Sequence, residues 1–265
     1  MDFNIQGSVD VAVFAGQSNM TGYGDYAEAI RCDENAGYEF RSVGQLPGLV
    51  PVAEPFGYGE DREGFICEIA ADGAKARYGG MIAAIFDEYY KTCGRQLIGI
   101  SASKGGTDTE WWKSSLIYDA LKRLDAALEF LNRQNITIDR IFVVWCQGES
   151  DGDKKLPSEI YKANLRALQK QFTSHGTKEF FIVQIGHYNY IDYPEGGMEI
   201  DADYEVIRRA QQEICVSDDD FIMVGSFESY IRGMKDMYHY KQSTYNEVGK
   251  SVGKSIAQYY EEESV

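Results

Sequence analysis

An apolar run that stops at a glycine, with a serine close behind it, most constrains how this chain can fold. Residues 11–15 read Val-Ala-Val-Phe-Ala, Gly16 ends the run, and Ser18 follows two residues later. A short apolar run of this kind predicts a buried strand of a parallel sheet. Ligands and catalytic groups collect at the carboxyl ends of such strands, which makes Ser18 a candidate nucleophile. The same position also suits a serine that caps the next helix.

The rest of the chain alternates further strands with helices. Short β-prone apolar runs are separated by segments whose apolar residues recur with helical spacing. This alternation predicts an α/β fold, a three-layer α/β/α sandwich with a five-stranded, mainly parallel sheet, formed as a single domain over residues 1–265. Strands are predicted at 11–15, 97–101, 141–145, 180–185 and 221–224, and helices at 73–93, 116–131, 157–172, 204–216 and 243–260.

A stretch rich in glycine and proline, from about residue 21 to residue 72, interrupts the alternation. Pro47, Pro51 and Pro55 all lie in it. A loop of this length inside a compact domain is usually either functional or disordered. Aromatic residues such as Tyr23 are interleaved along the stretch and favour order. We interpret it as a long loop that lines the site.

Charge and cysteine content exclude several classes of protein. The formal net charge of −16 disfavours nucleic acid and anionic membrane surfaces as partners, and fits a neutral or hydrated substrate better. The five cysteines are scattered without a CxxC pair, so no zinc site or disulfide framework is indicated, and no motif calls for a metal or other cofactor. The first residues lack the features of a signal peptide, which favours the cytoplasm, although a secreted protein whose leader was removed would look the same. The oligomeric state stays open.

Four loops that follow predicted strands carry polar groups suited to acyl transfer. They contain Gln17-Ser18-Asn19, Gly105-Gly106-Thr107, Gln147-Gly148-Glu149, and the pair Asp236 and His239. Because the carboxyl ends of parallel strands meet at one edge of a sheet, we expect these groups to lie together. Acyl transfer requires a nucleophile, a base, a carboxylate that orients the base, and donors for the oxyanion.

The choice of a base is narrow because the chain has only three histidines. His175 stands near the end of a predicted helix and is expected at the surface. His187 follows the fourth predicted strand and is the rival base. His239 has Asp236 three residues before it, a spacing that lets the carboxylate reach the imidazole and select its tautomer.

Four blocks of sequence occur in a fixed order along most of the chain. They are Gly16-Gln17-Ser18-Asn19-Met20, Gly105-Gly106-Thr107 with a following tryptophan, Trp145-x-Gln147-Gly148-Glu149-Ser150-Asp151, and Asp236-x-x-His239. Together they resemble the sialate O-acetylesterase-like branch of the SGNH/GDSL hydrolases, which includes carbohydrate acetylesterases. The resemblance implies a flavodoxin-like SGNH-hydrolase fold that forms one esterase domain.

The resemblance also implies a role for each matched residue. Ser18 would attack the ester carbonyl, and His239 would act as base and then as acid, oriented by Asp236. The backbone amides of Ser18 and Gly106 would hold the oxyanion. Gln147 stands where the wider superfamily has an asparagine donor, so its side chain is the expected third donor.

Five further residues are expected to support or line the site. Gln17 and Glu149 are supporting residues, and Glu149 can brace the Ser18 turn, contact the histidine or be purely structural. Trp111, Trp112 and Tyr188 are candidate faces for stacking on a sugar, while adjacent tryptophans serve equally often as core lids.

The function expected from these residues is that of a serine esterase that removes O-acetyl groups from a carbohydrate through an acetyl-serine intermediate. One alternative is a carbohydrate-binding protein on the same fold with weak turnover. Another is a short-chain lipase or thioesterase, which the polar and aromatic loops disfavour. The partner is an acetylated sugar or oligosaccharide, and the sequence does not choose among sialic acid, xylan fragments and other glycans. The negative charge disfavours sialate through long-range repulsion alone.

Overall fold

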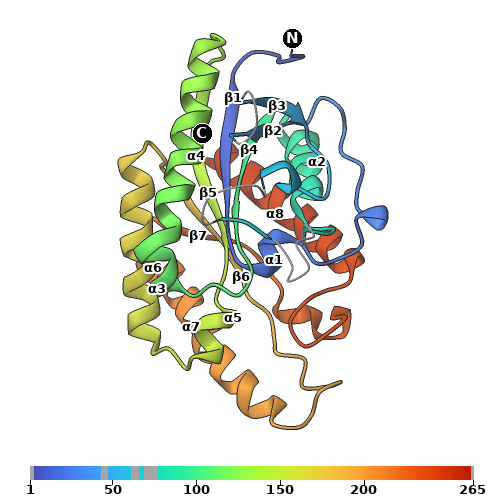
Figure 1. The fold of residues 1–265 in the computed structure, drawn as a ribbon, viewed down its shortest axis with the longest axis vertical. Coiled ribbons are helices and arrows are strands. Elements are labelled where there is room, and N and C mark those ends of the chain that lie inside the picture. The colour runs from blue at the N-terminus through green and yellow to red at the C-terminus, as the bar shows by residue number, and fades with distance from the viewer. Residues whose placement is uncertain (1–2, 43–46, 61–65, 69–76, 264–265) are drawn as a thin grey trace.

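The computed structural model describes residues 3–42, 47–60, 66–68 and 77–263. A single sheet crosses the molecule, and helices cover both of its faces (Figure 1). The strands are β1 (Val9–Gly16), β2 (Gly37–Arg41), β3 (Gly48–Pro51), β4 (Leu97–Ser103), β5 (Ile138–Cys146), β6 (Phe180–Gln184) and β7 (Phe221–Ser226). The helices are α1 (Ser18–Thr21), α2 (Ile82–Cys93), α3 (Thr109–Trp111), α4 (Ile117–Arg133), α5 (Glu149–Asp153), α6 (Ser158–Ser174), α7 (Gly197–Ser217) and α8 (Gln242–Glu262). Short 3₁₀ turns lie at Tyr26–Glu28, Tyr58–Glu60 and Glu228–Gly233, and a π-helical turn at Trp112–Leu116.

The sheet has seven strands in the order β3-β2-β4-β1-β5-β6-β7. β1 is central and pairs in parallel with both β4 and β5. Without β2 and β3, the remaining strands follow the flavodoxin-like order, in which the chain reverses its winding direction at the central strand. The predicted α/β class is therefore confirmed, and each of the five predicted strands is present. The predicted strand count is wrong by the two strands that the stretch 21–72 contributes.

β2 and β3 were not predicted because their local sequence resembles a loop. They are five and four residues long. β2 pairs in parallel with β4, and a Cβ added at Gly37 would lie 1.9 Å from the Leu97 carbonyl oxygen. β3 is the edge strand and ends at Pro51, a residue that an edge position tolerates because its missing N–H needs no partner. The residues of β2 form a strand by pairing with β4, and those of β3 by pairing with β2, although their own sequence pattern does not predict strands.

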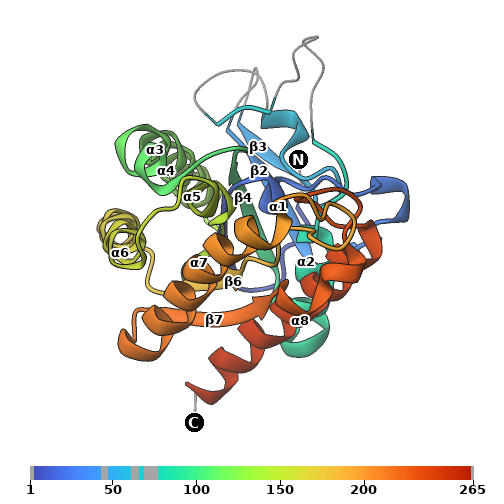
Figure 2. The same ribbon diagram turned by 90° about the horizontal axis from the view of Figure 1, so that it is seen from below.

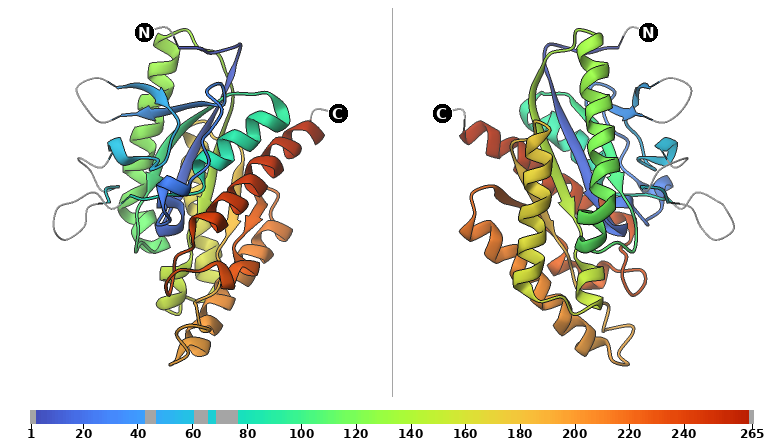
Figure 3. Two further views of the ribbon diagram at one scale, coloured as in Figure 1. Left: turned by 90° about the vertical axis from the view of Figure 1, so that its right-hand side faces the viewer. Right: turned by 60° about the vertical axis from the view of Figure 1, so that its left-hand side comes forward.

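Alternate side chains of the strands enter two separate cores. Val11 and Val13 of β1 belong to the core that α4, α6 and α7 cover, whereas Ala12 and Phe14 belong to the core beneath α2 and α8. Figure 2 shows α4 and α6 on one side of the sheet and α2 and α8 on the other, and Figure 3 shows each of these faces in turn. Burial on both faces explains why the strands read as nearly unbroken apolar runs.

Helix boundaries differ from the predicted ones mainly at their starts. α2 begins at Ile82, and residues 73–76 of the predicted helix lie outside the described residues. Its end agrees with the prediction, because Gly94 adopts a left-handed conformation and donates its N–H to the Tyr90 carbonyl. α7 begins at Gly197 rather than at residue 204, since the glycines there locally favour a loop. In the described part of the chain, no helix is both long and apolar enough to cross a membrane.

α2 and α8 pack so closely that their backbones nearly touch. A Cβ added at Gly249 would lie 2.4 Å from the Met81 carbonyl oxygen, and one added at Gly253 would lie 2.4 Å from the Ile85 carbonyl oxygen. Glycine at both positions therefore sets the distance between these helices. α8 begins three residues after His239, so this packing also helps to position the last strand-end loop.

We predict that Gly253→Ala destabilises the protein. The added methyl group must push α8 away from α2, and overpacking of this kind costs about 1–3 kcal/mol, of which the better helix propensity of alanine offsets about 0.5–1 kcal/mol. The free energy of unfolding in urea measures the change. Gly48→Ala is the control, because its new Cβ would meet nothing within 4 Å. Equal stability of the two variants would contradict the close helix packing.

Candidate active site

Ser18 is the first residue of α1, directly after the central strand. The turn requires glycine at residue 16, where φ is +143° and a Cβ would lie 2.0 Å from the Cys146 carbonyl oxygen. The residue that caps α1 is Gln17 rather than Ser18, so the serine hydroxyl is not the helix cap. Ser18 is largely buried but lines a cavity. Figure 1 shows α1 at the same end of the sheet as α5.

The cavity beside Ser18 has a volume of about 330 Å³ and lies at the carboxyl ends of the strands. Residues from the loops after β1, β4, β5 and β7 all reach it, as the reversal of winding at a central strand predicts. Its size suits a small ligand. The lining residues are Gln17, Ser18, Tyr23, Glu68, Gly105, Gly106, Glu149, Ser150, Asp153, Tyr238 and His239.

Asp236 and His239 form a hydrogen-bonded pair in a tight loop. The Nδ1 atom of His239 lies 3.1 Å from Asp236 Oδ2, and the backbone N–H groups of Tyr238 and His239 donate to Oδ1 at 2.9 and 2.8 Å. Burial raises the pKa of Asp236, but the hydrogen bonds from the imidazole and the backbone outweigh it and lower the pKa to about 2. Asp236 therefore stays ionised at neutral pH. Since Nδ1 faces this carboxylate, Nε2 is the nitrogen available to a ligand.

Tyr23 packs against one face of the His239 imidazole. The rings of Tyr23 and His239 are stacked, with centroids 4.2 Å apart and planes 7° apart. Burial, together with the negative charge of Glu68, raises the pKa of Tyr23 to about 12, so the phenol stays protonated. Tyr23, from the stretch that was expected to line the site, therefore lines the cavity and fixes the orientation of the His239 ring.

Asn19 links the Ser18 turn to the other loops. Its Nδ2 donates to Glu149 Oε1 at 2.6 Å and to the Tyr238 carbonyl at 3.1 Å, while Tyr245 donates its hydroxyl to Asn19 Oδ1 at 2.7 Å. Glu149 is buried, and burial raises its pKa although the Asn19 hydrogen bond acts in the opposite direction. No hydrogen-bond partner of its Oε2 is found among the residues that the structure describes. Through this hydrogen bond, Glu149 is linked to the helical turn that begins at Ser18.

Gln147 lies behind the cavity and not in it. It is fully buried, its Nε2 lies 3.0 Å from the Thr107 carbonyl and 3.2 Å from Gln17 Oε1, and it also donates to Asp151. Acceptors within the protein therefore engage both amide hydrogens. This arrangement corrects the expectation that the Gln147 side chain is an oxyanion donor, because the chain turns it toward the buried carboxylate of Asp151.

Gln17 also holds the loop after β5. Its Oε1 accepts hydrogen bonds from the backbone N–H groups of Gly148 and Ser150, at 3.4 and 3.2 Å. The supporting role expected for Gln17 is thus a physical link between the first and third strand-end loops.

The three aromatic residues expected to stack on a sugar do not line the cavity. Trp112 is fully buried, lies edge-on to Trp145 at 5.0 Å and donates its Nε1–H to Thr107 Oγ1, so it is a core residue. Tyr188 is 5% exposed and packs edge-on against neighbouring tyrosines. Trp111 is 41% exposed, and the Lys104 ammonium lies over its ring, 5.9 Å from the centroid. The sequence shows that these three residues are aromatic, but it does not show in which direction their side chains point.

The two other histidines also lie outside the cavity lining. His175 pairs with Asp125 at 2.7 Å near the end of α6, as a surface residue should. His187, the rival base, pairs with Asp201 at 2.8 Å. Of the three histidines, His239 is the one that lines the cavity, so position after a strand is not sufficient to place a histidine there.

Six residues that line the cavity were not among the predicted site residues. Gly105, Ser150, Asp153 and Tyr238 lie within or next to the predicted motifs, so proximity to a motif residue would have found them. Tyr23 lies five residues after Ser18 in the stretch that we expected to line the site. Glu68, which accepts a hydrogen bond from the Gly105 N–H, has no local signal.

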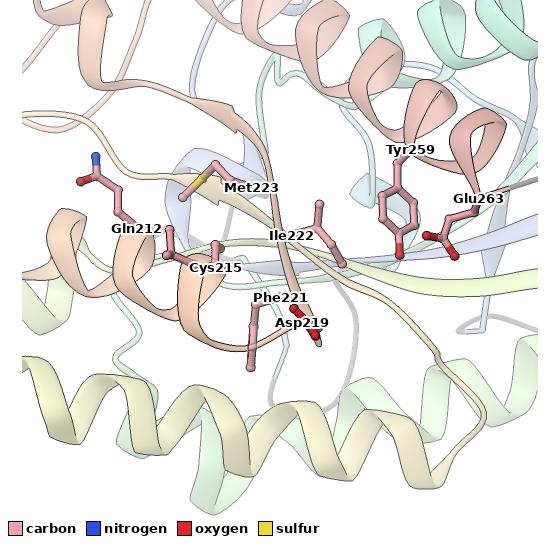
Figure 4. Close-up of a pocket in the computed structure, with 9 residues that line it drawn as sticks. Gln212, Cys215, Asp219, Phe221, Ile222, Met223, Tyr259 and Glu263 are labelled. Atoms are coloured by element: carbon pink, nitrogen blue, oxygen red, sulfur yellow. The ribbon is translucent and has the colours of Figure 1, made fainter. Parts of the chain in front are cut away.

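A second cavity, of about 660 Å³, lies at the β7 edge of the sheet between α7 and α8. Figure 4 shows Phe221, Ile222 and Met223 of β7 facing it together with Cys215 of α7. Burial raises the pKa of Cys215 to about 12, which makes its thiol a poor nucleophile. Within the described residues, no group of three or more His, Cys, Asp or Glu side chains is placed to hold a metal ion.

We predict that Asn19→Ala destabilises the protein by about 1–3 kcal/mol, because it leaves the buried Tyr245 hydroxyl and Glu149 carboxylate without their partner. The raised pKa of an acid penalises its ionised form, so the loss should be larger at pH 8 and should shrink as the pH falls toward the ordinary carboxyl range. Urea unfolding at several pH values measures it. Asn132→Ala, on the exposed surface of α4, is the control and should change little. A loss independent of pH would contradict the coupling to Glu149.

Comparisons with known proteins identify a family and structures with a similar fold. The family model for carbohydrate esterase, sialic acid-specific acetylesterase, matches residues 8–258. A search of curated protein sequences finds no match.

Several solved structures share the α/β fold of this chain. An Arabidopsis thaliana protein is 19% identical, with a TM-score of 0.63 over 96% of this chain and 98% of its own. NanS is 13% identical, with a TM-score of 0.64 over 97% of this chain and 99% of its own. A carbohydrate acetylesterase from Xanthomonas citri is 14% identical, with a TM-score of 0.59 over 97% of this chain and 57% of its own. With the family model matching nearly all of its length, this chain belongs to the carbohydrate esterase family of sialic acid-specific acetylesterases.

Proposed function

We propose that this protein is a serine esterase that removes O-acetyl groups from a carbohydrate, with Ser18 as nucleophile, His239 as general base and acid, and Asp236 as the orienting carboxylate. The observation that carries the proposal is that Ser18, Gly106 and His239 line one cavity while Asp236 holds the far nitrogen of the imidazole. Family membership supports acetylesterase activity on sugars. The serine mechanism is our inference from the residues.

In the first half-reaction, Ser18 Oγ attacks the acetyl carbonyl while His239 Nε2 accepts the hydroxyl proton. The Nδ1–H of the imidazole donates to the Asp236 carboxylate, which stabilises the imidazolium that forms. The tetrahedral intermediate then collapses, and its C–O bond to the sugar breaks. His239 returns the proton to the departing sugar oxygen, leaving acetyl-Ser18.

In the second half-reaction, a water molecule attacks the acetyl group of the serine ester. His239 takes a proton from this water and returns it to Ser18 Oγ as acetate leaves. The stacked ring of Tyr23 supports both steps, because it keeps the His239 imidazole in one plane while the imidazole gains and loses a proton.

The oxyanion of each tetrahedral intermediate requires preorganised donors. We assign this role to the backbone N–H groups of Ser18 and Gly106, both of which belong to residues lining the cavity. The N–H of Gly105 is engaged by Glu68. Gln147 supports the oxyanion donors indirectly, because its side chain donates a hydrogen bond to the Thr107 carbonyl in the loop after β4.

The lining of the cavity favours a short acyl group on a polar alcohol. Its side chains are polar or charged apart from the rings of Tyr23 and Tyr238, in the part of the chain that the structure describes. A lipase or thioesterase would need an apolar groove for a longer chain. A protein that only binds carbohydrate would have no physical need for the Asp236–His239 pair beside Ser18.

We predict that Ser18→Ala lowers kcat for an aryl acetate by on the order of 10⁶-fold, and Asp236→Asn by about 10⁴-fold. The asparagine keeps the shape of the carboxylate but favours the wrong imidazole tautomer. Steady-state hydrolysis measures both variants, and a burst of phenol release equal to the enzyme concentration would report the acetyl-enzyme. Wild-type turnover by Ser18→Ala would exclude the serine mechanism.

A matched pair of histidine variants tests the choice of base. His239→Ala should lose most of its turnover, because general-base catalysis contributes about 10²–10⁴-fold. His187→Ala removes an imidazole that is paired with a carboxylate in a similar way but lies outside the cavity lining, and it should keep its turnover. The opposite result would assign the base to His187.

A further inference from the structure

We infer that Asp153 and Tyr238 form a subsite for the alcohol part of the ester, and that this subsite selects acetyl esters of polyhydroxy alcohols with a free hydroxyl group next to the ester. The inference rests on the proposed function, because it concerns the alcohol that departs when Ser18 is acetylated. It agrees with the description of the family, since sialic acid is itself a polyhydroxy compound.

The departing alcohol lies on the His239 side of the cavity. In the proposed mechanism the imidazole returns its proton to the sugar oxygen, so that oxygen must come within hydrogen-bond reach of Nε2. Tyr238 directly precedes His239, lines the same cavity, and has its ring centroid 6.2 Å from that of the imidazole. The amides assigned to the oxyanion come instead from Ser18 and Gly106, in the loops after β1 and β4. Polar groups beside Tyr238 therefore meet the alcohol rather than the acetyl group.

Asp153 offers a carboxylate oxygen that the protein itself does not use. It is the last residue of α5, lines the cavity and is exposed. The hydroxyl of the buried Tyr204 donates to its Oδ1 at 2.9 Å. Among the residues that the structure describes, none donates to Oδ2. Because an ionised carboxylate accepts more strongly than a neutral oxygen, Oδ2 is suited to accept from a hydroxyl group of the substrate.

The phenol hydroxyl of Tyr238 likewise forms no hydrogen bond within the described ranges of the chain. Burial and the negative charge of Asp153 raise the pKa of Tyr238, so the hydroxyl keeps its proton at neutral pH. A protonated phenol can both donate and accept a hydrogen bond. The two residues therefore present a donor and an acceptor on the same side of the cavity, which matches a sugar hydroxyl that also does both.

Two buried tyrosines hold this subsite in place from behind. Tyr204 binds the Asp153 carboxylate, and Tyr188 packs edge-on against the rings of Tyr204 and Tyr238, with centroids 6.3 and 5.7 Å apart. Tyr188 and Tyr204 are 5% and 0% exposed. Groups that are already fixed lose little conformational freedom when a ligand binds, so more of the hydrogen-bond energy contributes to affinity.

An ester of a simple alkyl alcohol leaves both groups without a partner. Its hydrocarbon chain displaces water from Oδ2 and from the Tyr238 hydroxyl but forms no hydrogen bond in return. A site built to bind a substrate hydroxyl therefore rejects an analogue that lacks it. Because Asp153 is exposed, we expect a preference smaller than that of a fully enclosed site.

The experiment compares kcat/KM for glycerol 1-acetate and propyl acetate, measured as acetate release at pH 8. The two esters share the acetyl group and the length of the alcohol chain, and they differ in the free hydroxyls. Since kcat/KM covers the steps up to departure of the alcohol, it reports on the alcohol subsite. The variants are Asp153→Asn, which keeps an acceptor for Tyr204, and Tyr238→Phe, which keeps the ring.

Asp220→Asn and Tyr118→Phe are the matched controls. Asp220 is exposed in the turn before β7, Tyr118 is 62% exposed on α4, and neither lines the cavity. They remove the same charge and the same hydroxyl at places that the substrate does not reach. The ratio of the two kcat/KM values within one protein cancels any general loss of catalytic rate or of active enzyme.

We expect wild type to prefer glycerol 1-acetate by at least about tenfold. Asp153→Asn should lower this ratio about tenfold and Tyr238→Phe about three- to tenfold, as expected for the loss of a hydrogen bond to a charged and to a neutral group. Both controls should keep the ratio within about twofold of wild type, since isolated surface substitutions have small effects.

The inference is overturned if Asp153→Asn or Tyr238→Phe keeps the wild-type ratio, because a merely structural role would slow both esters equally. It is also overturned if wild type cleaves propyl acetate as well as glycerol 1-acetate. Wild type is assayed in parallel with 4-nitrophenyl acetate, an activated ester whose alcohol has no neighbouring hydroxyl. Failure to cleave this ester would count against the proposed esterase function, whereas its cleavage with an unchanged ratio in the variants would count against the subsite alone.

Discussion

The close approach of the carboxyl ends of β1 and β5 governs the geometry of the whole site. At Gly16 a side chain would collide with the Cys146 carbonyl oxygen, and the next residue, Gln17, donates its N–H to that same oxygen at 2.9 Å. The two central strands therefore end at one point, and their loops separate from there. Ser18 and Glu149 reach the same cavity because the chain cannot spread these strand ends apart.

Buried polar groups then hold the diverging loops in place. Thr109 donates both its N–H and its hydroxyl to the buried carboxylate of Asp151, which ties the loop after β4 to α5. Burial raises the pKa of Asp151 to about 6 in spite of these bonds, so its ionised form is costly. Asn19 likewise ties the Ser18 turn to Glu149 and to the backbone carbonyl of Tyr238. Burying a polar group without a hydrogen-bond partner costs more free energy than burying an apolar group. Such hydrogen-bond networks therefore restrict the loops to few arrangements.

The sequence predicts those elements that are specified by residues close together in the chain. The five predicted strands, the glycine that ends α2 and the Asp236–His239 spacing needed no distant partner to be recognised. β2 and β3 did need one, because β2 depends on pairing with β4, and β3 depends in turn on pairing with β2. The orientation of side chains within loops was equally hidden, which is why Trp112 and Tyr188 were expected at the surface of the site but are buried.

By itself, the sequence determined the α/β class, the edge of the sheet where the site lies, and Ser18, Asp236 and His239 as candidates, because strand periodicity and motif spacing are local properties. Only the tertiary structure decided which polar groups face the cavity. Gln147 turns inward to Asp151, whereas Tyr23 and Asp153 turn toward the ligand space. The physical reason is that a loop side chain points wherever distant partners satisfy its hydrogen bonds, and those partners come together only when the sheet has formed.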